Sequence, residues 1–531
     1  MGIGEDRKFT RTAKAMAKGS LHIFIGNTSA TVILALASIL MARLLTPESY
    51  GLYSLTLVVP GLFLTFTDLG TNSALLNFLP RSRERGDEGT TLECMRAALF
   101  FNILVSSSLS VLSFFVSGSM AQMLLNRSEI VPFVQLASSL ILLQAIVATS
   151  NSLFVGHDEA RYSAAISITQ AVVRFTLVLL VVPSLGLLGA VQSQVLGFLL
   201  ASALALLLSI RLYRGHSKGV ASPGLYKSLT SMLNYGFPIY SSAFLMGLLA
   251  RYQSAVLAWH ASNAEIGNYG IAQNFTSLVT VLTFPVSTML LSSFSKLDEK
   301  GDLRKLFGYS VKYAQLIAVP ACFLVAVTSR DLVELFYGSE YSMAPSYLTV
   351  YILTFSYSVF TIVLGNLFNG TGEVRIYFKT VLVKFLASMP LALILISYYR
   401  VFGMIASIIV SDLILLAYSY HKARERYAVG IDARGSIRIF SVSMLSAAAV
   451  LLLGMKLPTI SSLVKVLLNG SVFLVIYLTV SWLVGAIGRE DIGNLREMLK
   501  ETPLAPIAEK ILSLYEDLMT SLEKLLSIGR E

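Results

Sequence analysis

The chain has 531 residues, of which 55% are hydrophobic and 14% are charged, and its mean hydropathy is +0.70. A soluble domain carries about 25% charged residues, so this composition excludes an ordinary soluble enzyme. The net charge of +10 does not indicate a nucleic-acid partner. Its Lys and Arg residues lie mainly in short segments between apolar stretches, where they set membrane orientation.

About fourteen apolar stretches are each long enough to cross a bilayer as an α-helix. We therefore predict an all-α, polytopic membrane protein with about fourteen transmembrane helices. The predicted spans are 21–43, 51–78, 97–125, 131–155, 163–183, 186–210, 231–258, 266–292, 311–329, 345–369, 376–397, 402–420, 439–456 and 462–487.

The charges of the connecting segments predict which side each one faces. Alternate segments, starting with the basic N-terminus 1–20, hold 26 Lys and Arg residues, whereas the intervening loops hold only Arg127, Arg330 and Arg400. Positively charged loops stay on the cytoplasmic side, so both termini are predicted to be cytoplasmic in a multi-pass protein of the cell membrane. The longest outer loop, 330–344, is too short to display a catalytic set, which argues against a membrane-bound glycan polymerase or transferase.

The tail, 489–531, follows a different pattern. After Pro503 and Pro506, apolar residues recur at three- and four-residue spacing, which predicts an amphipathic helix. We expect this cytoplasmic helix to pack on the protein or on a partner. Its apolar positions are Ile507, Ile511, Leu514, Leu518, Leu522 and Leu525.

Three sequence echoes indicate an internal repeat. The segment 46–53 resembles 262–269 at an offset of 216, 153–161 resembles 367–375 at 214, and 186–189 resembles 403–406 at 217. The echoes predict an N-terminal six-helix bundle, 21–210, and a C-terminal six-helix bundle, 231–420. Helices 13 and 14, 439–487, are additions. Parallel halves related by an axis along the membrane normal are typical of transporters, with the substrate site between them.

Two segments resemble a known family. The stretch Met41-Ala42-Arg43-Leu44-Leu45-Thr46-Pro47-Glu48-Ser49-Tyr50-Gly51-Leu52-Tyr53, followed by Asp68-Leu69-Gly70, is similar to the first helical hairpin of the polysaccharide-biosynthesis flippases. These are the O-antigen-type exporters of the multidrug/oligosaccharidyl-lipid/polysaccharide (MOP) superfamily. Arg251-Tyr252-Gln253 through Glu265-Ile266-Gly267-Asn268-Tyr269 resembles their seventh and eighth helices.

The resemblance implies a transporter, not an enzyme, that moves a polyprenyl-(di)phosphate-linked oligosaccharide from the inner to the outer leaflet. Its expected partners are this lipid-linked sugar, membrane lipids and glycan-assembly proteins. One departure is Gln253, where the family often has an Asp, which puts an ion-coupling role of that position in doubt. The alternative within the superfamily is a cation-coupled multidrug exporter.

Charged residues inside predicted spans are the candidate substrate-binding groups, because each costs at least about 2.5–3.5 kcal/mol to insert. Arg174 is in the middle of the fifth span, and Lys384 matches it in the eleventh if four residues are deleted. Two such cations suit a phosphate or diphosphate. Lys384 and Asp412 lie at a similar depth, so a salt bridge between them is the alternative.

Arg251 and Asp68 each allow two interpretations as well. Arg251 is in the outer half of the seventh span and either faces the substrate path or extends to the outer interface. Asp68 either accepts a proton or pairs with a cation, or it stabilises the turn Asp68-Leu69-Gly70. The amides of the spans, Asn72, Asn77 and Gln315 among them, suit either a wet lining or hydrogen bonds between helices.

No cofactor or metal site is predicted. The chain has no Gly-rich loop with Lys-Ser/Thr for ATP, and the Gly-x-x-Gly at 186–189 has no strand–helix context. Cys94 and Cys322 are in a predicted cytoplasmic loop and a span, so neither a disulfide nor a metal site is expected.

Overall fold

The computed structural model describes residues 26, 28–216, 224–276, 294, 297, 300–454 and 461–499, and ten positions between 509 and 520. Every regular element in these ranges is a helix. Eight of them are long and apolar enough to cross a membrane, and Thr28–Leu44 is a shorter apolar helix. This confirms the predicted all-α, multi-pass class, while the count of fourteen spans stays a prediction. The start of the predicted span 21–43 and the end of the predicted span 266–292 lie outside the described residues.

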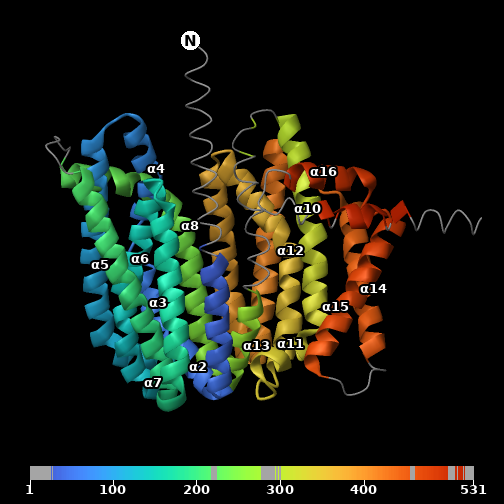
Figure 1. The fold of residues 1–531 in the computed structure, drawn as a ribbon, viewed down its shortest axis with the longest axis horizontal. Coiled ribbons are helices and arrows are strands. Elements are labelled where there is room, and N and C mark those ends of the chain that lie inside the picture. Colours follow the sequence, from blue (N-terminus) through green and yellow to red (C-terminus); the bar gives the residue numbers. More distant parts are fainter. Residues whose placement is uncertain are drawn as a thin grey trace, which may run out of the picture. The chain divides into compact units, whose positions relative to one another are not determined.

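The helices form two compact units, Met1–Gly270 with Phe378–Ser411, and Ile271–Tyr377 with Asp412–Glu531. In the first unit α5 packs beside α6 and α6 beside α7, and α8 contacts α3, α4 and α5 (Figure 1). The helices of this unit are α2 (Pro47–Thr56), α3 (Val58–Leu64), α4 (Thr71–Glu84), α5 (Glu88–Met123), α6 (Val131–Gly156), α7 (Ala160–His216) and α8 (Leu225–His260). Residues 263–276 are also helical.

The predicted span 51–78 is wrong as a single helix, because it consists of α2, α3 and the start of α4. The chain leaves helical geometry after α3, where Leu69 and Gly70 have positive φ angles of 46° and 94°. Thr65 and Thr67 donate their hydroxyls to the carbonyls three residues earlier, at 2.6 and 2.9 Å. A hydrophobicity pattern cannot reveal such a break, because side chains satisfy the freed carbonyls within the same apolar stretch.

Matching backbone breaks support the internal repeat. In α7 the break is at Gly186 (φ 53°, ψ −125°), and in α13 (Val374–Tyr427) it is at Arg400 (φ 51°, ψ −121°), 214 positions later. The turns before these helices match as well, with positive φ at Asp158 and at Gly372. The structure aligns Gly189 with Gly403, since both pack against a carbonyl eight residues earlier in their own hairpin. The 217-residue echo is therefore corrected to 214.

A reciprocal contact joins two copies of the repeat within the first unit. A Cβ atom on Gly51 would overlap the Asn263 carbonyl, and one on Gly267 would overlap the Pro47 carbonyl. Gly267 lies 216 positions after Gly51, and Asn263 lies 216 positions after Pro47, so the two contacts involve the same two positions of the repeat. This reciprocity is expected where a pseudo-twofold axis passes between related segments. Glycine is required at both positions because the two backbones touch.

The second unit contains α10 (Lys300–Val327), α11 (Ser329–Tyr337), α12 (Ala344–Gly370), α14 (Ala433–Gly454), α15 (Ser462–Leu483) and α16 (Arg489–Leu499). Two features differ from the sequence-based expectation. The segment 330–344, predicted to be a loop, contains most of α11, and the tail forms α16 before its prolines. Ile492, Tyr515 and Met519 are buried in a core with residues of α10 and α14, so the described part of the tail packs on the protein itself. Ile507, Ile511, Leu518, Leu522 and Leu525 lie outside the described residues.

The contact between Gly51 and Gly267 predicts that even one methyl group is harmful there. Gly267→Ala should lower the free energy of unfolding by about 1–3 kcal/mol, because backbone must move to admit the side chain. Gly118→Ala in α5 is the matched control, since a Cβ there meets nothing within 4 Å. Thermal unfolding of both purified variants in one detergent measures the effect. An unchanged midpoint for Gly267→Ala would show that the two backbones do not touch.

Candidate functional site

Arg174 lies in α7 with no acidic partner among the described residues. Its Nη2 donates to the hydroxyl of Tyr53 at 3.2 Å, and Tyr53 itself is only 4% exposed. Its Nε is buried and has no hydrogen-bond partner. Gly197, on the second half of α7, leaves room for the Arg174 stem, because a Cβ there would lie 3.2 Å from the Arg174 Cβ. A neutral phenol is thus the recorded partner of this cation, and its full positive charge remains.

Arg251 lies in α8, and its guanidinium packs against the backbone of Gly61 in α3. A Cβ atom on Gly61 of α3 would overlap the Arg251 guanidinium, so glycine is what makes room for this group. Within the described ranges the guanidinium has neither a hydrogen bond nor an ion pair. Gly61 follows Pro60 in the short α3, and α3 packs against α8. The sequence alone gave no sign that Gly61 serves Arg251.

Gln253, the position at which this chain departs from the resembled family, makes a buried structural contact. Its Nε2 donates to the Ser388 hydroxyl at 3.1 Å, and the neighbouring Tyr252 hydroxyl donates to the Met389 carbonyl at 3.1 Å. Both acceptors belong to the first half of α13, within the same unit. The amide at 253 therefore fastens α8 to α13 and carries no charge.

Asp68 lies two residues before Gly70, the N-cap of α4, and its side chain accepts hydrogen bonds from the first turn of this helix. Its Oδ1 accepts the Asn72 backbone N–H at 2.8 Å and the Thr71 hydroxyl at 3.0 Å. The backbone of the neighbouring Gly70 touches Gly236, whereas Arg251 is fifteen residues further along α8. At 1.5 Å per residue this is about 22 Å, so Asp68 and Arg251 are too far apart to pair.

Lys384 and Arg174 are not at equivalent positions. The helices α7 and α13 begin and break at the same offset, so no four-residue deletion separates their first halves. Lys384 therefore aligns with Gln170, and Ser388 aligns with Arg174. Lys384 lies about 6 Å closer to its helix start than Arg174 does. Asp412 begins the part of α13 that belongs to the second unit, so the Lys384–Asp412 pairing stays a prediction.

Polar contacts between predicted outer loops were not foreseen. Arg127 donates from Nε to the Asn263 side chain at 2.7 Å and from Nη2 to the Ala261 carbonyl at 3.0 Å. Arg400 lies 3.3 Å from a carboxylate oxygen of Glu265. Arg127 and Arg400 are two of the only three cations in the predicted outer loops. Their rarity there was the one sequence feature that could have indicated a structural role. All of these contacts are within the first unit and fasten three of its connections together.

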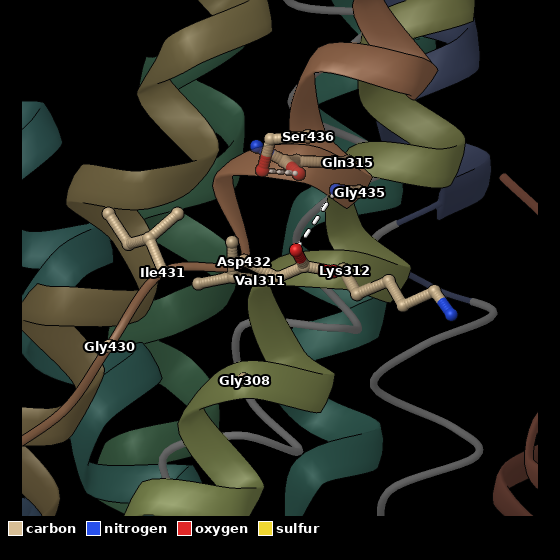
Figure 2. A pocket seen from close by; sticks show the side chains of 9 residues that line it. All are labelled: Gly308, Val311, Lys312, Gln315, Gly430, Ile431, Asp432, Gly435 and Ser436. Carbon is tan, nitrogen blue, oxygen red and sulfur yellow. Dashed lines mark hydrogen bonds between the residues drawn. The ribbon is translucent and has the colours of Figure 1, made fainter.

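A small pocket lies in the second unit, between α10 and the start of α14 (Figure 2). Ser436 donates to the Gln315 side-chain oxygen at 3.0 Å, and the Gly435 N–H donates to Asp432 at 3.0 Å. The pocket has a volume of about 10 Å³, which is room for about one water molecule and far below the 300–1,000 Å³ usual for ligand sites. It is too small for a lipid-linked sugar.

Next to this pocket, Asp491 attaches the tail to α10. Its carboxylate is 2.6 Å from the Lys312 ammonium and accepts the Tyr313 hydroxyl at 3.2 Å and the Gly488 N–H at 2.8 Å. The residue is 5% exposed. Sequence reasoning counted Lys312 only as a loop cation, because nothing in the sequence relates it to a residue 179 positions later.

The fold is shared with solved membrane transporters. It matches a structure described as "Lipid II flippase MurJ, inward closed conformation" with a TM-score of 0.71 and 14% identity, covering 86% of this chain and 97% of that one. It also matches an inward-facing multidrug resistance MATE family transporter of the MOP superfamily, with a TM-score of 0.65 and 15% identity over 78% of this chain and 98% of that one. The protein thus has the multi-pass helical fold of these two structures.

The particular family follows from the sequence itself. The family described as "Polysaccharide biosynthesis protein" matches residues 40–345. This is more than half of the chain, so the chain belongs to that family, as the resemblance of its first hairpin predicted. It is also similar to a "Putative O-antigen transporter" of Shigella dysenteriae, 22% identical over 213 residues. The match covers 40% of this chain and spans about half, 54%, of that relative.

The Glu265–Arg400 contact predicts a pH dependence of stability. Burial raises the pKa of Glu265, but the backbone N–H and hydroxyl of Ser262 and the Arg400 guanidinium outweigh it, so the pKa is below its usual 4.5. The unfolded chain then binds more protons, and the stabilisation is present above pH 4.5 and lost as pH falls through the lower folded pKa. Arg400 is 61% exposed, which limits the effect to about 0.5–1 kcal/mol.

Glu265→Gln should therefore unfold at a lower temperature than the unmodified protein at pH 7, and the gap should close below pH 4.5. Thermal unfolding across pH 3–7 measures this. Glu129→Gln, at an exposed outer-loop position, is the control and should give no gap. A gap that persists at the acidic end would mean that Glu265 acts through packing alone.

Proposed function

We propose that this protein flips a polyprenyl-(di)phosphate-linked oligosaccharide from the cytoplasmic to the outer leaflet by alternating access, for cell-surface polysaccharide or glycan biosynthesis. The observation that carries the proposal is the state of Arg174 and Arg251. Both lie in apolar helices, and neither has a carboxylate partner in the described part of the chain. A cation in hydrocarbon requires water or an anion, and the (di)phosphate of the lipid carrier supplies the anion.

The chemistry of the two arginines suits this substrate. A guanidinium binds phosphate oxygens through two parallel N–H groups, and these bonds are roughly twice as strong as neutral ones. The free Nε of Arg174 and the unpartnered guanidinium of Arg251 retain donors for such binding. Lys384 adds a point charge at a different depth, which suits contact with the same anion at another stage of its passage. The family description and the relative described as a putative O-antigen transporter support a sugar-bearing lipid as the substrate.

The competing function is a cation-coupled multidrug exporter, because the MATE transporter has the same fold. A pathway for cationic drugs needs acidic groups that can bind them. In the first unit, Asp68 accepts hydrogen bonds from the first turn of α4 and Gln253 is neutral. The positive charge of the candidate residues therefore favours an anionic substrate.

The test is leaflet exchange of a fluorescent polyprenyl-diphosphate oligosaccharide in proteoliposomes. Arg174→Ala and Arg251→Ala should each slow exchange about tenfold or more, since a hydrogen bond to a charged group contributes about 1.5–3 kcal/mol. The Lys variants should recover part of the rate. Arg161→Ala is the matched control, because Arg161 is exposed and already binds Glu159 at 2.7 Å.

Two outcomes would overturn the proposal. Normal exchange in both Ala variants would remove the arginines from the mechanism. No exchange by the unmodified protein, together with export of cationic dyes, would assign the drug-exporter function instead.

A further inference from the structure

Gly61 is a buried glycine inside a regular helix, α3. Its helical backbone conformation is open to other residues, so no special φ angle requires glycine there. Glycine within a helix is destabilising relative to alanine, because it loses more conformational freedom on folding. The reason for glycine at this position must therefore lie in the groups that surround it.

The neighbour of Gly61 is the flat face of the Arg251 guanidinium. A Cβ atom on Gly61 would have Cζ of Arg251 as its nearest atom, with Nε at 2.6 Å and Nη2 at 2.7 Å. A point in the plane of the guanidinium and outside the group would be nearer to a nitrogen than to Cζ, because three nitrogens surround this carbon. The position of the missing Cβ is therefore over the centre of the face, and glycine allows the group to lie flat on α3.

This contact leaves the edge of the guanidinium available. The five N–H donors of arginine lie in the plane of the group, and within the described ranges none of those of Arg251 donates a hydrogen bond. Two parallel N–H groups in that plane match two oxygens of a phosphate. Stacking on a ring would instead use a face of the guanidinium, and Gly61 covers one of the two faces. The arrangement thus favours recognition of an anion by the edge.

Contacts on both sides of α8 fix the direction of Arg251. Gly247, four residues earlier, also faces α3, since a Cβ there would lie 2.9 Å from the Thr65 methyl group. At about 100° per residue, Gln253 points to roughly the opposite side of the helix, where it donates to Ser388 of α13 at 3.1 Å. The helix is held from both sides, so Arg251 cannot avoid an added side chain on α3 by rotation of α8.

We propose that Gly61 is a positioning residue for Arg251, which holds the guanidinium flat on α3 so that its free edge binds the (di)phosphate of the lipid carrier. This role rests on the proposed transport function. In Gly61→Ala the guanidinium would have to withdraw by about 1 Å to reach an ordinary contact distance. A binding group must be held within about 0.5 Å of its productive position, so this shift weakens binding. The fold should tolerate the change, because the end of a long side chain has other rotamers available.

A double-mutant cycle on binding tests the proposal. The probe is tritiated farnesyl diphosphate, a short polyprenyl diphosphate without sugar, and a scintillation proximity assay measures its binding to the purified full-length protein in detergent. Arg251→Ala should weaken binding about tenfold, and Gly61→Ala about threefold or more. In the Arg251→Ala background, Gly61→Ala should have no further effect, because the group that it displaces is then absent.

Gly247→Ala is the matched control. It adds the same methyl group to the contact between α3 and α8, but this methyl meets the Thr65 side chain and not the guanidinium. Binding of the probe by Gly247→Ala should equal that of the unmodified protein. Thermal unfolding of Gly61→Ala should give an unchanged midpoint, which separates displacement of Arg251 from loss of the fold.

The possible failures are distinguishable. Unchanged binding by Gly61→Ala, equal weakening by this change in both backgrounds, or a large fall in its unfolding midpoint would overturn the positioning role alone. Unchanged binding by Arg251→Ala, or no saturable binding by the unmodified protein, would overturn it together with the phosphate-binding role of Arg251. Leaflet exchange is measured separately, so the transport function can survive any of the first three results.

Discussion

The absence of hydrogen-bond partners in hydrocarbon is the constraint on which this structure depends. Backbone groups that leave a helix within the membrane must be satisfied by the protein. The break between α3 and α4 meets this requirement locally, through the hydroxyls of Thr65 and Thr67 and the carboxylate of Asp68. The break in turn positions Gly61 against Arg251 and Gly70 against α8. One irregular segment thus positions both the surroundings of Arg251 and the start of α4 against α8.

Charge in this fold is handled in two different ways. Outside the predicted spans and at their ends, several cations have carboxylate partners, as in the Glu265–Arg400 and Lys312–Asp491 contacts. Arg174 and Arg251 differ from these cations. Arg174 donates a hydrogen bond to the Tyr53 hydroxyl, and the Arg251 guanidinium packs against Gly61. Their lack of counter-charge is therefore the feature that a function must explain, and an anionic lipid carrier explains it.

Close backbone contact provides the second structural theme. The reciprocal contact of Gly51 and Gly267 joins related positions of the repeat without any side chain between them. The equal geometry at Gly186 and Arg400 indicates that the repeat preserves backbone shape even where residue type differs.

The sequence by itself determined the membrane class and the family, and it predicted a repeat, because hydropathy, loop charge and local motifs are carried by neighbouring residues. It also singled out Arg174, Arg251 and Lys384 as charges that need an explanation. It could not determine the break after α3, the alignment of Lys384 with Gln170, or the roles of Gly61 and Asp491. Those features depend on helix register and on contacts between residues far apart in the chain. An apolar stretch also has the same hydropathy whether its helix is continuous or broken. Only the tertiary structure decided which polar atoms were left without partners, because pairing is a property of three-dimensional contact and not of composition.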